Sequence, residues 1–107
     1  MHILPILANF QAELLQIYGE NLEGIILFGS YARGDFRQGS DIDLLLLFDE
    51  NFAEFKKDDA IFDVIVNYMM DKKVVITPLG IQKKFFESRK TPLMLNVQRE
   101  GIELWKK

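Results

Sequence analysis

The stretch LFGSYARGDFRQGSDIDLLLLF, residues 27–48, places a short polar segment between two apolar runs. The first run ends in the pair Gly29-Ser30, and the second begins directly after Asp43. We interpret this order as a strand, a Gly-Ser turn, a short helix and a second strand. Because residues two apart on a strand point to the same side, we expect Asp41 and Asp43 to project together.

Two carboxylates at one spot indicate a cation between them. At about 4 Å, two like charges repel by roughly 4 kcal/mol when the effective dielectric is about 20. Oxygen ligands of this kind suit Mg²⁺ or Mn²⁺, which complete their shell with water and substrate phosphates. We therefore predict that Asp41 and Asp43 are metal ligands.

The turn before the carboxylates has the features of a phosphate site. Gly29 lets the backbone approach a ligand closely, and the start of the following helix favours anions. Ser30 adds a hydroxyl, and Arg33, one helical turn further on, falls on the same face and could reach a phosphate or brace the carboxylates. Taken singly, Ser30 is equally consistent with a helix cap and Arg33 with a surface ion pair. Gly34 is expected to end the turn.

The segments GSYARGD, residues 29–35, and SDIDL, residues 40–44, resemble the signature of the minimal nucleotidyltransferases of the DNA polymerase beta superfamily. The resemblance implies that the Gly-Ser pair holds a nucleoside triphosphate. It also implies that Asp41 and Asp43 bind the metals for nucleotidyl transfer and are therefore the catalytic residues. Our nucleotide-binding candidates are Gly29, Ser30, Arg33 and Ser40, and the implied ligands are Mg²⁺ (or Mn²⁺) and ATP or another nucleoside triphosphate.

The sequence departs from this family at one point. Active members usually add a third carboxylate on a later strand, yet residues 74–77, Val-Val-Ile-Thr, contain no acid. Asp71, just before them, is the nearest candidate, and Asp63 is the other acid nearby. Two aspartates without this third group can still bind a metal and a nucleotide, but they lack the group that activates the attacking hydroxyl.

The resemblance also implies a partner. Minimal nucleotidyltransferases are often one half of a toxin-antitoxin pair whose other half is a helical HEPN-type protein, and some MntA-like antitoxins transfer AMP to that partner. We interpret the chain as such an antitoxin. One alternative is a catalytically silent nucleotide-binding subunit that neutralises its partner by binding, and another is a small-molecule nucleotidyltransferase of the antibiotic-modifying kind that needs a partner chain.

Composition narrows the class of protein. The length of 107 residues predicts a single domain, residues 1–107. A formal net charge of -3 makes nucleic acid an unlikely partner. With no cysteine and one histidine, thiolate and histidine-rich metal sites are excluded within one chain. We find no targeting signal and no apolar run of roughly 20 residues, and therefore expect a cytoplasmic protein without a membrane anchor.

Hydrophobic periodicity and turn residues predict an α/β (α+β) fold in which helices flank a small mixed sheet. Strands are expected at residues 22–28, 41–48, 74–77 and 102–105, and helices at 5–18, from 50 to 70 with a break near 56–59, 81–86 and 92–100. Strands 22–28 and 41–48 should pair antiparallel, with the second in the centre of the sheet. Pro78 should end strand 74–77, and Gly101 should end the last helix.

Overall fold

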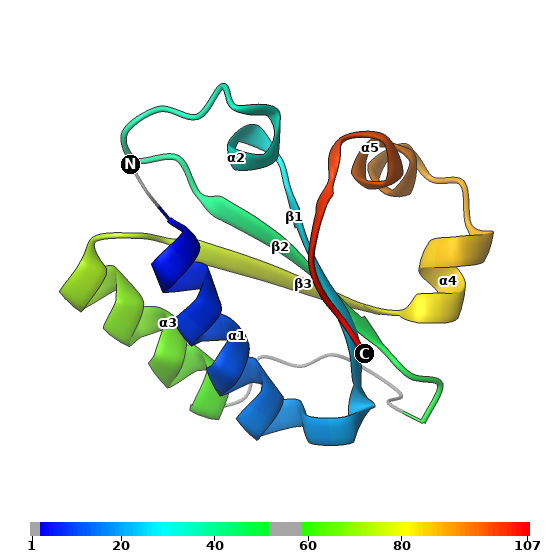
Figure 1. Cartoon of the computed structure of the whole chain (residues 1–107), viewed down its shortest axis with the longest axis horizontal. Coiled ribbons are helices and arrows are strands. Elements are labelled where there is room, and N and C mark those ends of the chain that lie inside the picture. The colour runs from blue at the N-terminus through cyan, green and yellow to red at the C-terminus, as the bar shows by residue number, and fades with distance from the viewer. Residues whose placement is uncertain (1–2, 52–58) are drawn as a thin grey trace.

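The computed structural model describes residues 3–51 and 59–107 (Figure 1). These residues form one four-stranded sheet with helices on both faces. The strands are β1 (Leu22–Phe28), β2 (Ile42–Phe48), β3 (Ile76–Gln82) and β4 (Ile102–Lys106). The helices are α1 (Leu4–Tyr18), the 3-10 turn η1 (Gly19–Asn21), α2 (Ser30–Arg33), α3 (Asp59–Lys72), α4 (Lys83–Ser88) and α5 (Pro92–Glu100). No helix within these described ranges is long and apolar enough to cross a membrane.

The strand order β3-β2-β1-β4 makes the sheet mixed, as predicted. β1 pairs antiparallel with both β2 and β4, whereas β2 pairs parallel with β3. β2 is an inner strand, and its residues from Leu44 to Phe48 are all buried. The prediction of a central strand covered on both faces is therefore confirmed, and so is the antiparallel pairing of the two strands that flank the polar segment.

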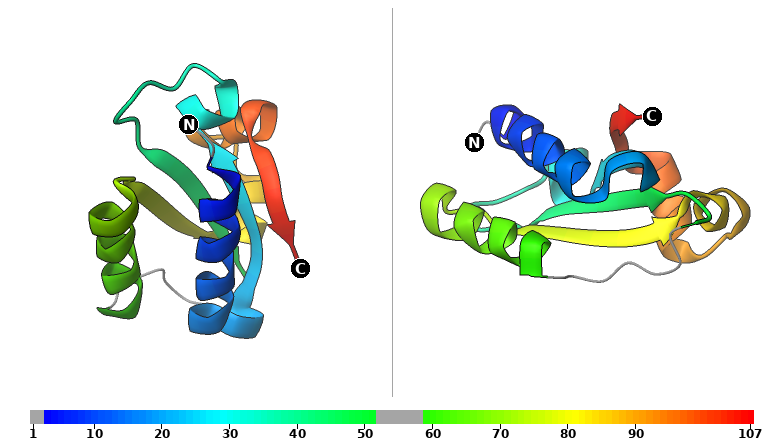
Figure 2. Two further views of the ribbon diagram at one scale, coloured as in Figure 1. Left: turned by 60° about the vertical axis from the view of Figure 1, so that its left-hand side comes forward. Right: turned by 90° about the horizontal axis from the view of Figure 1, so that it is seen from below.

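Each face of the sheet has its own hydrophobic cluster, because alternate strand residues point to opposite sides. On one face, residues such as Ile42, Leu44 and Leu46 pack against α1 and α3. On the other, Leu45 and Leu47 pack with Val97 of α5 and Phe86 of α4. Figure 2 shows the two helix pairs at separate ends of the molecule. We call the second face the α5 face.

The first helix and the last helix form where the sequence predicts them. Pro5 lies in the first turn of α1, and Gly19 follows its last residue with a positive φ of 57°. Thr91 caps α5, since its Oγ1 accepts a hydrogen bond from the backbone N-H of Met94 at 3.2 Å. Local residues set the bounds of α1 and the start of α5, which explains why these predictions succeed.

The prediction that Pro78 ends a strand is wrong. β3 begins at Ile76, runs through Pro78 and continues to Gln82, so α4 starts at Lys83, two residues later than expected. β3 lies at the edge of the sheet. The backbone N-H of Ile42 donates to the carbonyl of Val75 at 2.8 Å, and in a parallel ladder the same parity points Pro78 away from β2. A proline at such a position removes no ladder hydrogen bond.

The start of the helix predicted from near residue 50 falls at the edge of the described residues. Residues 50 and 51 form a turn in which Oδ1 of Asp49 accepts from the backbone N-H of Asn51 at 3.1 Å. The next described helix, α3, begins at Asp59 and runs to Lys72, slightly beyond the predicted end at Met70. Residues 52–58, which include most of the predicted break, lie outside the described residues.

Candidate active site

The acid pair stands at the start of β2, beside the end of β1. Asp43 is the antiparallel partner of Phe28, so Gly29 and Ser30 follow directly at the same end of the sheet. Leu45 and Leu47, two and four residues after Asp43, belong to the hydrophobic cluster on the α5 face. Strand alternation therefore points Asp43 to the α5 face as well. The turn and the acids, predicted as one unit from sequence, lie together in space.

Gly29 is in contact with the carboxylate of Asp43. Its backbone has a φ of 76° and a ψ of -155°, a conformation that residues with a Cβ rarely adopt. A Cβ placed on Gly29 would collide with Oδ2 of Asp43 and would lie 3.2 Å from its Cγ. Glycine is needed here for both reasons, because only a residue without a side chain lets this carboxylate lie against the turn.

The electrostatics of the pair favour a cation. Burial, above all, raises the pKa of the half-buried Asp43 carboxyl, the charge of Asp41 raises it further, and the positive charge of Arg33 opposes the rise. Asp41 is thus close enough to act on Asp43. A donor set of two carboxylates with exposed Asp41 on the solvent side fits Mg²⁺ or Mn²⁺, which bind one or two carboxylates and retain water.

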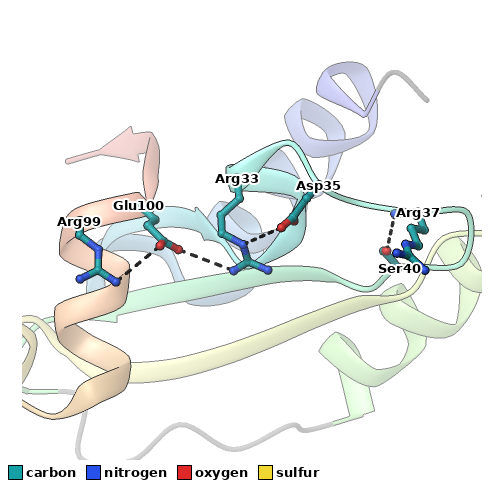
Figure 3. A network of polar contacts seen from close by, with 6 residues as sticks. All are labelled: Arg33, Asp35, Arg37, Ser40, Arg99 and Glu100. Carbon is teal, nitrogen blue, oxygen red and sulfur yellow. Dashed lines mark hydrogen bonds and ion pairs between the residues drawn. The ribbon is translucent and has the colours of Figure 1, made fainter.

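Arg33 is held by two carboxylates from different parts of the chain (Figure 3). Its Nε donates to Oδ2 of Asp35 at 3.2 Å, and its Nη1 lies 3.6 Å from Oε2 of Glu100 at the end of α5. Glu100 also lies 3.6 Å from Nη2 of Arg99. The sequence-based interpretation of Arg33 as a surface ion-pair residue and its interpretation as a site residue thus both fit this position.

The two serines have different local roles. Ser30 is the first residue of α2, and its carbonyl accepts from the backbone N-H groups of Gly34 at 2.9 Å and Asp35 at 3.1 Å. Gly34 ends the helix, as predicted, and its backbone is left-handed. Ser40 closes the following loop, since its Oγ accepts from the backbone N-H of Arg37 at 2.8 Å. Ser40 thereby fixes the loop that leads into Asp41.

The strand register shows which residues adjoin the acids on β3. Asp43 pairs with Thr77, and continuing this register back by two residues brings Val75 beside Asp41. Val75 is 38% exposed, whereas its neighbours Val74 and Ile76 are buried in the cluster of the opposite face. Val75 therefore points to the same face as Asp43, although sequence analysis did not distinguish it from the other residues of 74–77.

Asp71 lies in the last turn of α3 and is exposed. Among residues 3–51 and 59–107, no group of three or more acidic or histidine side chains is arranged to hold a metal ion. Asp71 therefore does not join Asp41 and Asp43 in such a group, and its role as a third acid stays a prediction. Sequence analysis missed Glu100 altogether, because no motif links the end of α5 to the Gly-Ser turn.

Replacing Asp43 with asparagine should raise thermal stability in the absence of metal. Folding raises the pKa of Asp43, so the folded state binds its proton more tightly, and stability is lost as pH rises through the folded pKa. In EDTA at neutral pH, Asp43→Asn should melt at a higher temperature than the wild type. The difference should shrink below the unfolded carboxyl pKa of about 3.9.

Circular dichroism melting curves across this pH range provide the measurement. Asp63→Asn, on the exposed side of α3, is a control that removes one carboxylate away from the site. A lower melting temperature for Asp43→Asn at neutral pH would show that the ionised carboxylate is stabilised by contacts that outweigh its burial.

The turn, the carboxylate pair and the neighbouring arginine have the chemistry that a phosphorylated ligand and a cation require. Residues 7–93 match the family model described as "Nucleotidyltransferase domain". MJ0141 of Methanocaldococcus jannaschii, named "Putative protein adenylyltransferase", is 34% identical over 104 residues, which are 97% of this chain and 100% of that protein. The chain therefore belongs to the nucleotidyltransferase domain family.

Solved structures agree with this assignment. A chain of a "toxin-antitoxin with AMP-PNP" is 25% identical and superposes with a TM-score of 0.61, over 92% of this chain and 73% of that one. A chain in a structure of a tri-AMPylated Shewanella oneidensis HEPN toxin with its MNT antitoxin is 22% identical, with a TM-score of 0.56 over 96% and 72% of the two chains. Chains of MntA-type toxin-antitoxin structures thus share the fold of this chain, so the predicted fold is confirmed.

Proposed function

We propose that this chain transfers AMP from ATP to a protein acceptor, and that the acceptor is a HEPN-type partner in a toxin-antitoxin pair. The contact between Gly29 and the carboxylate of Asp43 carries this proposal, because it joins a turn suited to phosphate to a pair suited to a divalent cation. The name of MJ0141, the AMP-PNP of one neighbour and the AMPylated toxin of another support the nucleotide and the acceptor.

Each residue of the candidate site binds a different part of the metal-nucleotide complex in this proposal. Gly29 and Ser30 hold the triphosphate, Arg33 neutralises part of its charge, and Asp41 and Asp43 would hold Mg²⁺ or Mn²⁺. When bound, the metal neutralises phosphate charge and makes the α-phosphorus more electrophilic. The acceptor's hydroxyl oxygen forms a bond to the α-phosphorus, the bond from that phosphorus to the bridging oxygen breaks, and pyrophosphate leaves. The hydroxyl proton passes to solvent.

A second function follows from the missing acid. Val75 stands beside Asp41 where a carboxylate would complete the group, and the described residues hold no three-acid cluster. A chain with this site can bind ATP without activating the acceptor hydroxyl. It would then act as a nucleotide-binding subunit that neutralises its partner by forming a complex.

Intact-mass spectrometry separates these two functions. The protein is incubated with ATP, Mg²⁺ and a candidate HEPN-type partner protein, and each chain is weighed. We expect the partner to gain the mass of one or more AMP units, and to gain none with the Asp41→Asn, Asp43→Asn double variant. A stable complex without any mass gain would contradict the transferase proposal and support the binding subunit.

Ser30→Ala should weaken ATP binding modestly. Ser30 begins α2 beside Gly29 without capping the helix, and losing one hydroxyl contact typically costs about 0.5 to 1.5 kcal/mol. Titration calorimetry with ATP and Mg²⁺ should show this loss, while Ser88→Ala on α4 should leave the affinity unchanged. Equal affinities for the Ser30 and Ser88 variants would make Ser30 a structural residue.

A further inference from the structure

Glu100 is the only one of Arg33's two ion-pair partners that comes from a distant part of the described chain. Asp35 follows Arg33 in the same loop, whereas Glu100 ends α5 and reaches Arg33 from the α5 face. In Figure 3, the guanidinium of Arg33 lies between the two carboxylates. Glu100 is also more buried than Asp35, with its side chain 32% exposed against 62%.

The position of Glu100 is fixed by the strand that carries the Gly-Ser turn. Gly101 donates its backbone N-H to the carbonyl of Val97 at 2.8 Å, and a Cβ on Gly101 would lie 2.7 Å from Cγ2 of Ile26. The backbone after Glu100 thus packs directly on β1, and Ile102 then pairs with Leu27. Since β1 ends at Phe28, the same strand sets the position of both Glu100 and the turn.

The two ion pairs leave part of the guanidinium for a ligand. They use Nε and Nη1, and neither uses Nη2. An arginine offers five N-H donors in a planar fork that suits phosphate oxygens. Exposed ion pairs add little stability, so the network serves orientation better than it serves folding.

The direction of the guanidinium matters because Arg33 is half-exposed and flexible side chains lose entropy when a ligand fixes them. With Asp35 alone, Arg33 has a partner only within its own loop. Glu100 gives it a second partner on the face to which Asp43 points. A guanidinium already held there binds a triphosphate with less loss of rotamer freedom.

We propose that Glu100 is a positioning residue that holds Arg33 over the α5 face for contact with the triphosphate of the nucleotide. This inference rests on the proposed nucleotide-binding function and goes beyond it, because it assigns a role to a residue outside the sequence motif. Glu100 itself touches no substrate in this scheme. Its effect on the nucleotide passes through Arg33.

The test is a double-mutant cycle on ATP affinity, measured by calorimetry with Mg²⁺. Glu100→Gln keeps the shape of the side chain and removes its charge, and Arg33→Ala removes the group that it positions. We expect Glu100→Gln to weaken ATP binding by about three- to tenfold in the wild type and not at all in the Arg33→Ala background. Glu87→Gln on exposed α4 makes the same charge change away from Arg33 and should have no effect.

The signs of the outcomes separate the explanations. If Glu100 acts only through its charge, Glu100→Gln will strengthen ATP binding in both backgrounds, because it removes a negative charge near a polyanion. That result, or equal affinities with and without Glu100, would overturn the positioning role. A general loss of structure would lower the melting temperature and would weaken binding in the Arg33→Ala background as well, which also contradicts the proposal.

The same titration separates this inference from the proposed function. A wild-type protein that binds ATP while Glu100→Gln binds it equally well refutes the role of Glu100 and leaves the proposed function standing. A wild-type protein that does not bind ATP at all refutes both. Transfer assays add a further readout, since loss of positioning in the ground state should raise KM for ATP more than it lowers kcat.

Discussion

The double variant Asp41→Asn, Asp43→Asn should lose Mg²⁺-dependent ATP binding and AMP transfer while keeping its fold. Asparagine has the shape of aspartate but no charge, so the site can no longer compensate a divalent cation. Removing groups that merely support metal ligands commonly costs about 10- to 100-fold in metal affinity or activity, and removing the ligands themselves should cost at least the upper value. Calorimetry with ATP, with and without Mg²⁺, measures the loss.

The expectation that the fold survives has its own physical reason. Asp41 is exposed, and the ionised form of Asp43 is disfavoured by burial and by Asp41, so neither charge stabilises the folded chain. A melting temperature at or above that of the wild type in EDTA would agree with this view. Asp63→Asn serves as the control for loss of carboxylates at a distant position. Unchanged ATP affinity in the double variant would refute the metal assignment.

The segment from β1 to β2 could be predicted from sequence because its determinants are local. Strand alternation, the Gly-Ser pair and the left-handed Gly34 each act within a few residues, and the structure has them as expected. Sequence reasoning also placed Gly29 and Asp43 in one unit. It could not show that the Asp43 carboxylate rests against Gly29, which depends on how β1 pairs with β2.

The end of β3 could not be predicted, because its determinant is the position of the strand in the sheet. A proline normally ends a strand. At Pro78, however, the missing N-H would face away from the sheet at its edge, so no ladder hydrogen bond is lost. The contact of Glu100 with Arg33 could not be predicted from sequence for a similar reason. Its meeting with Arg33 results from the packing of Gly101 against β1, and no local pattern encodes that contact.

Val75→Asp should increase the rate of AMP transfer. The β2-β3 register brings residue 75 beside Asp41 on the face of Asp43, and the exposure of Val75 allows a carboxylate there to keep its hydration. A group that takes the proton of an acceptor typically contributes about 10²- to 10⁴-fold, so even an imperfectly placed aspartate should raise kcat by roughly tenfold. Transfer of AMP to the partner protein under single-turnover conditions is the measurement.

The Asp71→Asn variant tests whether the site lacks a third carboxylate or whether Asp71 supplies it. Asp71 lies in the last turn of α3 and belongs to no three-acid group in the described part of the chain, so its replacement should leave the transfer rate unchanged. Loss of transfer in Asp71→Asn, with no gain in Val75→Asp, would instead make Asp71 the third acid.

Without metal, a third carboxylate adds repulsion, so Val75→Asp should melt at a lower temperature than the wild type in EDTA and recover stability when Mg²⁺ is added. Recovery that exceeds the effect of Mg²⁺ on the wild type would indicate that the new carboxylate binds the same ion as Asp41 and Asp43.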